Sequence, residues 1–141
     1  MNIVQLDGYA ANPGDINLRQ WQTIPAPGGG YCSFTTYERT PPELVVERAA
    51  EADIVITNKV LMTDGVMARL PKLKYIGVLA TGCNVIDMEA ARRRGIVVRN
   101  VPAYSTASVA QLTFAHILNI ANGVALHGRS VSEGEWGRCP D

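Results

Sequence analysis

The sequence predicts an α/β fold, a flavodoxin-like three-layer sandwich with a parallel sheet, followed by a long helix. Short apolar runs alternate with helical segments over the first hundred residues. One of these runs, 54–56, is continuously β-branched, which is typical of a strand that is buried on both faces. Consecutive strands joined by single helices run parallel with right-handed crossovers. Together these observations favour a three-layer arrangement.

The first two strands are predicted from apolar runs bounded by turn residues. Residues 2–6 form the first run, and the polar stretch 9–17 that follows predicts a loop. Pro and Gly residues then cluster in 25–30. After them, aromatic and β-favouring residues alternate over 31–37, so we expect the second strand there.

Capping residues predict where the helices begin and end. Thr40 at the cap, Pro41 at the first helical position and Glu43 three residues after Thr40 predict a helix to about Glu51. The remaining elements are expected in the following order: strand 54–56, helix 64–70, strand 75–79, helix 87–94 closed by Gly95, strand 96–98 and helix 108–126.

Charge and cysteine content exclude several classes of protein. Lys plus Arg equals Asp plus Glu at 13 each, so we expect neither nucleic acid nor a membrane as a partner. Cys32, Cys83 and Cys139 have no C-x-x-C spacing, so neither a disulfide framework nor a metal site is indicated. No signal peptide or long apolar span is evident. These features predict a cytoplasmic protein.

The last predicted helix is apolar on nearly all sides. A helix of this kind needs a cover, which is either another domain or a second subunit. The polar stretch 128–141 supplies no further element that could close a domain. We therefore expect additional sequence beyond Asp141.

The loops after the strands are the candidate binding sites, because ligands of parallel sheets bind at the carboxyl ends of strands. The turn 80–84 contains Gly82, and its successive N–H groups suit an organic carboxylate. A plain strand-to-helix turn explains the same residues. Segment 99–106 leads into the long helix, where capping by Ser105 or Ser108 is an alternative to ligand binding.

Two longer motifs carry a resemblance to a known family. The run 77–87, GVLATGCNVID, resembles the substrate-loop signature of the D-2-hydroxyacid dehydrogenases. The run 98–111, VRNVPAYSTASVAQ, resembles the hinge and interdomain helix of the same family. The segments 6–9, 12–15 and 57–59 look most like its glycerate dehydrogenase or hydroxypyruvate reductase branch.

The resemblance implies a role for several residues. It assigns substrate binding to Ala80, Thr81, Gly82, Asn100 and Tyr104, with the main-chain amides of Thr81 and Gly82 binding the substrate carboxylate. It also places Thr106 near the nicotinamide end of the cofactor. The family's catalytic Arg and its His–Glu pair are expected beyond Asp141.

The implied activity is hydride transfer between NAD or NADP and a small 2-oxo or 2-hydroxy acid. Residues 1–100 then form the substrate-binding domain, and 101–141 form the hinge, the interdomain helix and the start of an incomplete nucleotide-binding domain. The G-x-G-x-x-G fingerprint is absent, because Gly28-Gly29-Gly30 precedes a strand. We expect this chain alone to be inactive and the intact protein to be a homodimer through the interdomain helix.

Two other functions remain as alternatives. A receiver-like signalling module has a similar pattern, but it needs an acidic pair after the first strand and an acceptor Asp after the third. The sequence has only Asp7 and, at the second place, Asn58. A non-catalytic, dehydrogenase-like scaffold is also compatible, because the residues that would decide are absent. His116, on the apolar side of the long helix, is expected to pack and not to catalyse.

Overall fold

A computed structural model describes residues 1–12 and 14–138 of the chain. The chain forms two compact units, Met1–Pro102 and Ala103–Asp141. The sequence expectation placed a boundary two residues earlier, after Asn100. Pro13, which the 12–15 motif includes, and Cys139 lie outside the described residues.

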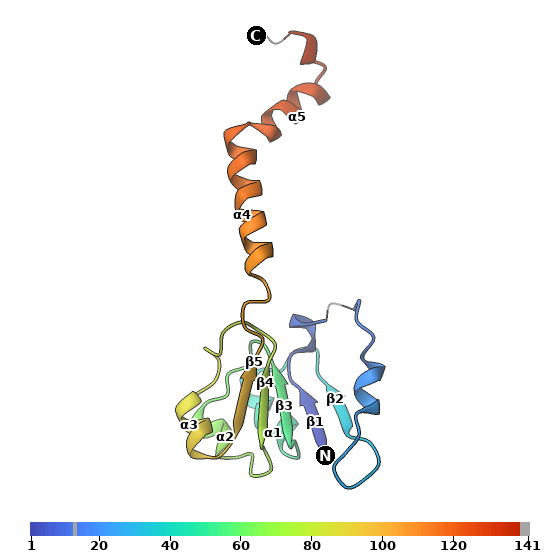
Figure 1. The fold of residues 1–141 in the computed structure, drawn as a ribbon, viewed down its shortest axis with the longest axis vertical. Coiled ribbons are helices and arrows are strands. Elements are labelled where there is room, and N and C mark those ends of the chain that lie inside the picture. Colours follow the sequence, from blue (N-terminus) through green and yellow to red (C-terminus); the bar gives the residue numbers. More distant parts are fainter. Residues whose placement is uncertain (13, 139–141) are drawn as a thin grey trace. The chain divides into compact units, whose positions relative to one another are not determined.

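The first unit is built on one sheet of five parallel strands in the order β2-β1-β3-β4-β5 (Figure 1). This order is that of the flavodoxin-like fold, so the predicted fold class is confirmed. Each strand contains four residues, and their limits are β1 Asn2–Gln5, β2 Ser33–Thr36, β3 Ile54–Thr57, β4 Tyr75–Val78 and β5 Val97–Asn100.

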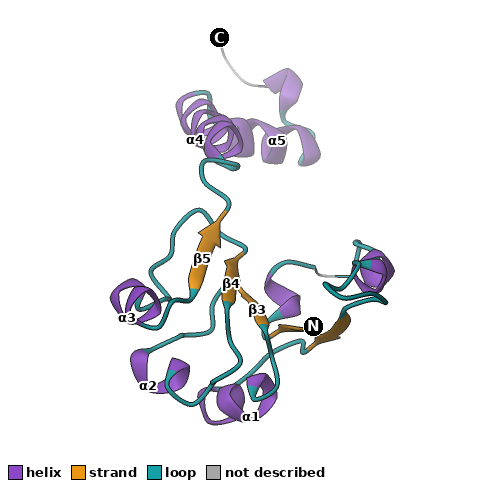
Figure 2. Ribbon diagram, turned by 60° about the horizontal axis from the view of Figure 1, so that its bottom comes forward, coloured by secondary structure: helices purple, strands orange, loops and turns teal. Residues whose placement is uncertain are grey.

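Three short helices cover one face of this sheet (Figure 2). They are α1 Val45–Ala49, α2 Asp64–Met67 and α3 Met88–Arg93. Their buried side chains pack against Val4, Val55 and Ile76 of the strands, and Val55 and Ile76 are fully buried. Burial of such side chains is worth about 1.5–3 kcal/mol each, so this cluster is the main stabilising core of the unit.

Within residues 1–102, the 3₁₀ helix η2 Leu18–Thr23 covers part of the opposite face of the sheet. Trp21 of η2 stacks on Phe34 of β2, with 5.2 Å between ring centroids. Ile3, Cys32 and Ile56 are the buried members of this smaller apolar cluster. The sequence analysis did not predict η2, and it treated the short 3₁₀ helix η1 Gly8–Ala10 as loop.

The predicted start of the first α-helix is wrong. Pro41 is the cap residue and its side chain accepts no hydrogen bond from the helix, and a 3₁₀ turn, η3 Pro42–Leu44, leads into α1. The Thr40 hydroxyl instead accepts a hydrogen bond from Nη1 of Arg48 at 2.9 Å. The helix ends at Ala49, two residues before the expected limit of about Glu51. In contrast, the Asp87 cap is confirmed, since its carboxylate accepts the N–H of Ala90 at 2.9 Å.

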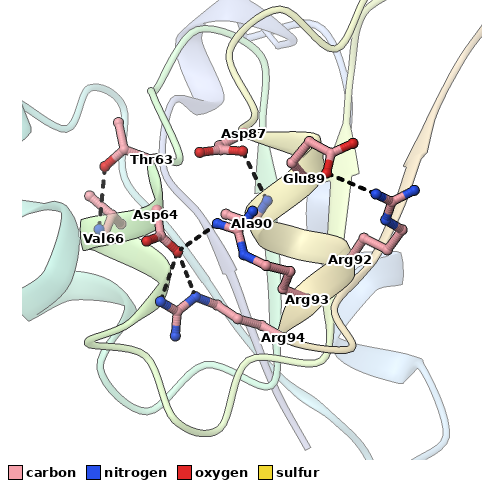
Figure 3. A network of polar contacts seen from close by, with 9 residues as sticks. All are labelled: Thr63, Asp64, Val66, Asp87, Glu89, Ala90, Arg92, Arg93 and Arg94. Carbon is pink, nitrogen blue, oxygen red and sulfur yellow. Dashed lines mark hydrogen bonds and ion pairs between the residues drawn. The ribbon is translucent and has the colours of Figure 1, made fainter.

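A polar network joins α2 to α3 (Figure 3). Nε and Nη2 of Arg94 donate to the same oxygen of Asp64 at 3.0 and 2.8 Å. Arg93 lies 3.7 Å from that oxygen, whereas Arg92 pairs with Glu89 within its own helix. Arg92 and Arg93 lie in the last turn of α3, and Arg94, the residue that caps this helix, links α3 to α2.

The second unit contains α4 Thr106–Ala121, α5 Val124–Ser132 and the 3₁₀ turn η4 Trp136–Arg138. The sequence predicted one helix over 108–126, and this is wrong because Gly123 adopts a left-handed conformation, with φ +56°, that ends the first helix. Ser105 precedes α4 but makes no side-chain cap, so the capping alternative fails there.

No single helix in the described ranges meets the length and apolarity of a membrane span; α4 and α5, bent by 58°, do so only as a pair.

Candidate substrate-binding site

All five parallel strands end at the same edge of the sheet, and the loops after four of them form the candidate site. The loops follow β1, β3, β4 and β5. The N–H of Leu79 donates to the carbonyl of Thr57 at 2.8 Å, which holds the ends of β4 and β3 together. The turn predicted to bind a carboxylate therefore begins directly at a strand terminus.

The main-chain amides of this turn are free. Within residues 1–12 and 14–138, the N–H groups of Ala80, Thr81 and Gly82 donate to no protein acceptor. Thr81 and Gly82 are exposed, and Ala80 is half-buried. A free, exposed pair of consecutive amides can accommodate an anionic oxygen atom of a ligand.

Donors at the end of β5 hold the carbonyl groups of the same turn. The side-chain Nδ2 of Asn100 donates to the carbonyl of Thr81 at 2.7 Å, and the N–H of Val101 donates to the carbonyl of Ala80 at 3.1 Å. In a trans peptide the N–H points opposite to the C=O, and the described residues contain no cis peptide. The N–H groups of Thr81 and Gly82 therefore both point away from β5.

The backbone conformation at position 82 does not require a glycine. Its φ lies outside the left-handed range, and an added Cβ would lie 3.4 Å from Oδ1 of Asn84.

The loop after β3 is fixed by Asp7, a role that the sequence analysis missed. The buried Asp7 carboxylate accepts N–H groups from Asn58 and Lys59 and a hydroxyl bond from Thr57, the latter at 3.2 Å. These amides are already used, so they are not available to a ligand. The exposed side chain of Lys59 is the cation that this loop offers.

The structure brings together some of the predicted substrate-binding residues. Ala80, Thr81, Gly82 and Asn100 lie within 1–102, where Asn100 contacts Thr81 directly. Tyr104 and Thr106 belong to the second unit, and both are exposed. Their predicted roles as substrate and cofactor contacts stay predictions.

The described residues do not form a dinucleotide site. Gly28, Gly29 and Gly30 have φ values of +95°, +102° and +74°, and they close a turn between Pro25 and Tyr31, which form an antiparallel bridge. This turn does not join a strand to a helix, so it lacks the geometry that binds a pyrophosphate. Nor do three His, Cys, Asp or Glu side chains come together as metal ligands in the described part of the chain.

Comparison with known proteins identifies the family. Residues 15–133 match the family model of the D-isomer specific 2-hydroxyacid dehydrogenase catalytic domain. The chain belongs to this family. The dehydrogenase resemblance of the 77–87 and 98–111 motifs is thus confirmed.

Individual relatives agree with this assignment. A hydroxypyruvate reductase of Blautia hydrogenotrophica is 43% identical to this chain over 144 residues, covering 100% of the chain and 42% of the relative. A glycerate dehydrogenase of Methylorubrum extorquens is 35% identical over 106 residues, covering 74% of the chain and 34% of the relative. The chain thus spans about two fifths of the Blautia relative and a third of the other.

Solved structures show the same fold. An NAD-dependent formate dehydrogenase from Staphylococcus aureus, solved in complex with NAD, superposes with a TM-score of 0.69 at 21% identity. The match covers 96% of this chain and 42% of that structure. At this identity the likeness supports the fold of the chain and nothing about its ligands.

Proposed function

We propose that this chain is the N-terminal part of an NAD- or NADP-dependent D-2-hydroxyacid dehydrogenase of the hydroxypyruvate reductase or glycerate dehydrogenase type. The observation that carries the proposal is the pair of free N–H groups at Thr81 and Gly82, oriented away from β5 at the carboxyl edge of the sheet. The family assignment and the names of the relatives support the reaction class.

In this proposal the chain binds and orients the substrate carboxylate. Hydrogen bonds from neutral N–H groups to a carboxylate are worth about 1.5–3 kcal/mol each, so two of them suffice to fix one end of a small acid. A reduced nicotinamide would supply hydride to C2 of the 2-oxo acid. Because the described residues form no dinucleotide site, that part of the reaction belongs to sequence beyond this chain.

The experiment is an assay of the full-length protein with hydroxypyruvate and NADH or NADPH. We expect oxidation of the nicotinamide by the full-length protein and none by the 141-residue chain alone. Turnover by the chain alone would contradict the division of roles. A full-length protein that binds the nicotinamide but reduces none of hydroxypyruvate, glyoxylate and pyruvate would favour the scaffold alternative.

We also propose that the second unit mediates homodimer formation and that the protein acts in the cytoplasm. The apolar side chains of α4 are more than half exposed, including Phe114 at 65% and Ile120 at 79%. Apolar patches of this kind are typical of protein interfaces. Light scattering of the full-length protein should give a dimer, and a monomer at micromolar concentration would contradict the proposal.

A further inference from the structure

Asn100 approaches the turn from one side only. Its Nδ2 bonds the carbonyl oxygen of Thr81 at 2.7 Å, whereas the N–H of Gly82 in the same peptide points the opposite way. A carboxylate that accepts this N–H lies across the peptide from the Asn100 amide. The separation is roughly 7 Å, from the width of the peptide and two hydrogen bonds.

We propose that Asn100 is a positioning residue, which orients the Thr81–Gly82 peptide for the substrate carboxylate without touching the substrate. The proposal rests on the function proposed above and changes the role expected for Asn100, from a substrate contact to a residue that acts through the turn.

The Thr81–Gly82 peptide needs a hydrogen bond that fixes its orientation, and we call the Asn100–Thr81 bond the tether. Thr81 and Gly82 are exposed, and in the described residues the Asn100 amide is the sole side-chain donor to the Thr81 carbonyl. A peptide that precedes glycine rotates easily, because glycine has wide conformational freedom. Without Asn100 the Gly82 N–H would sample many directions, and binding would have to order it.

The kinetic consequence differs from that of a group acting in the transition state. The substrate carboxylate keeps its charge during hydride transfer, so its amide contacts stabilise the ground state and the transition state equally. Loss of such uniform binding raises KM and leaves kcat nearly unchanged.

The first test is Asn100→Ala in the full-length protein, with hydroxypyruvate and saturating nicotinamide. We expect KM to rise about tenfold, with kcat changed by less than about twofold. The matched control is Asn2→Ala, because Nδ2 of Asn2 bonds the carbonyl of Glu51 at 3.0 Å at the amino edge of the sheet. Asn2→Ala should leave KM unchanged. An unchanged KM in Asn100→Ala, or a fall confined to kcat, overturns the proposal.

A double-mutant cycle separates positioning from direct contact. Gly82→Pro removes the N–H that Asn100 orients, and Gly82→Ala retains it. If Asn100 acts through this N–H, adding Asn100→Ala to Gly82→Pro should change KM by less than about twofold. If the two effects on KM multiply, Asn100 touches the substrate and the proposal is wrong.

A spectroscopic measurement tests the Asn100–Thr81 hydrogen bond without enzyme turnover. It applies even if Gly82→Pro fails to fold or the unsubstituted protein shows no turnover. The ¹³C resonance of the Thr81 carbonyl reports its hydrogen bond. We expect it to move upfield in Asn100→Ala and to stay in place in Asn2→Ala; an unmoved resonance in Asn100→Ala overturns the tether. Absence of turnover in the unsubstituted protein contradicts the proposed function and leaves this measurement of the tether intact.

Discussion

The two carboxylate oxygens of Asp7 accept the main-chain N–H of Asn58 at 3.0 and 2.9 Å, across 51 residues of sequence. The same carboxylate accepts the Lys59 N–H and the Thr57 hydroxyl, and this hydroxyl in turn accepts the N–H of Val60 at 3.1 Å. One buried acid thereby fixes the loop after β3 to the end of β1. It also removes the Asn58 and Lys59 amides from ligand binding.

Asp7→Asn should therefore destabilise the protein. The substitution removes the negative charge that the Asn58 and Lys59 N–H groups stabilise. It also places a side-chain NH₂ group, itself a donor, near these N–H donors. We expect the free energy of unfolding to fall by about 2 kcal/mol in urea unfolding. Glu47→Gln removes the same charge from an exposed helical position and should change stability by less than about 0.5 kcal/mol. Equal midpoints for the two variants would contradict the role of Asp7.

The ion pairs of Figure 3 should differ in strength. The Arg94 side chain is 35% exposed and donates twice to Asp64, whereas Arg92 and Glu89 are 76% and 69% exposed. Arg94→Ala should lower the free energy of unfolding by about 1 kcal/mol and Arg92→Ala by no more than about 0.3 kcal/mol, because exposed pairs are screened by solvent. The Arg94 effect should decrease in 1 M salt. A larger loss in Arg92→Ala would contradict the geometry.

Ala103 carries backbone strain at the start of the second unit. Its φ is +58°, a left-handed conformation that disfavours any side chain with a Cβ. Ala103→Gly should thus be neutral or stabilising, by up to about 1 kcal/mol. The same substitution within α4, Ala110→Gly, should destabilise by about 1 kcal/mol. Thermal unfolding should show a loss of stability in Ala110→Gly only, and a clear loss in Ala103→Gly would argue against the strained conformation.

Asp53, at the amino edge of the sheet, should stabilise the fold in a pH-dependent way. The N–H of Asn2, which its carboxylate accepts at 2.8 Å, lowers the pKa of Asp53 below 3.8, and Lys74 lowers it further. A pKa that is lower in the folded state gives a stabilisation that is complete above the unfolded value, near 3.8, and lost as pH falls through the folded value.

Asp53→Asn should accordingly be less stable than the unsubstituted protein at pH 7, by about 1 kcal/mol. The difference should shrink below about pH 4. Urea unfolding at a series of pH values measures both quantities. A difference that stays constant down to pH 2.5 would show that the charge of Asp53 is not responsible.

The sequence predicted the sheet well because its signals are local. Runs such as 54–56 are typical of strands buried on both faces, and each observed strand overlaps its expected range. Helix limits were less predictable. The apolar pattern of α4 continues past its end, and only Asn122-Gly123 signals the break. The Thr40 cap failed because Arg48, eight residues away, takes its hydroxyl.

The candidate site, like the fold, could be predicted from the sequence only in part. The turn 80–84 could be predicted because it follows a strand and contains Gly82. The bonds that give the turn its orientation could not, since Asn100 and Thr81 are 19 residues apart and meet only when β4 and β5 pair. Likewise, the hydrogen bonds of Asp7 could not be predicted from the sequence, because its partners reach it only when β1 and β3 pair.

The most direct measurement is a crystal structure of the full-length protein with a bound small 2-hydroxy acid such as D-glycerate. We predict that one carboxylate oxygen lies within about 3 Å of the main-chain nitrogen of Thr81 or Gly82, with Asn100 still bonded to the Thr81 carbonyl. A carboxylate bound elsewhere, with both of these amides paired to other protein groups, would contradict the account.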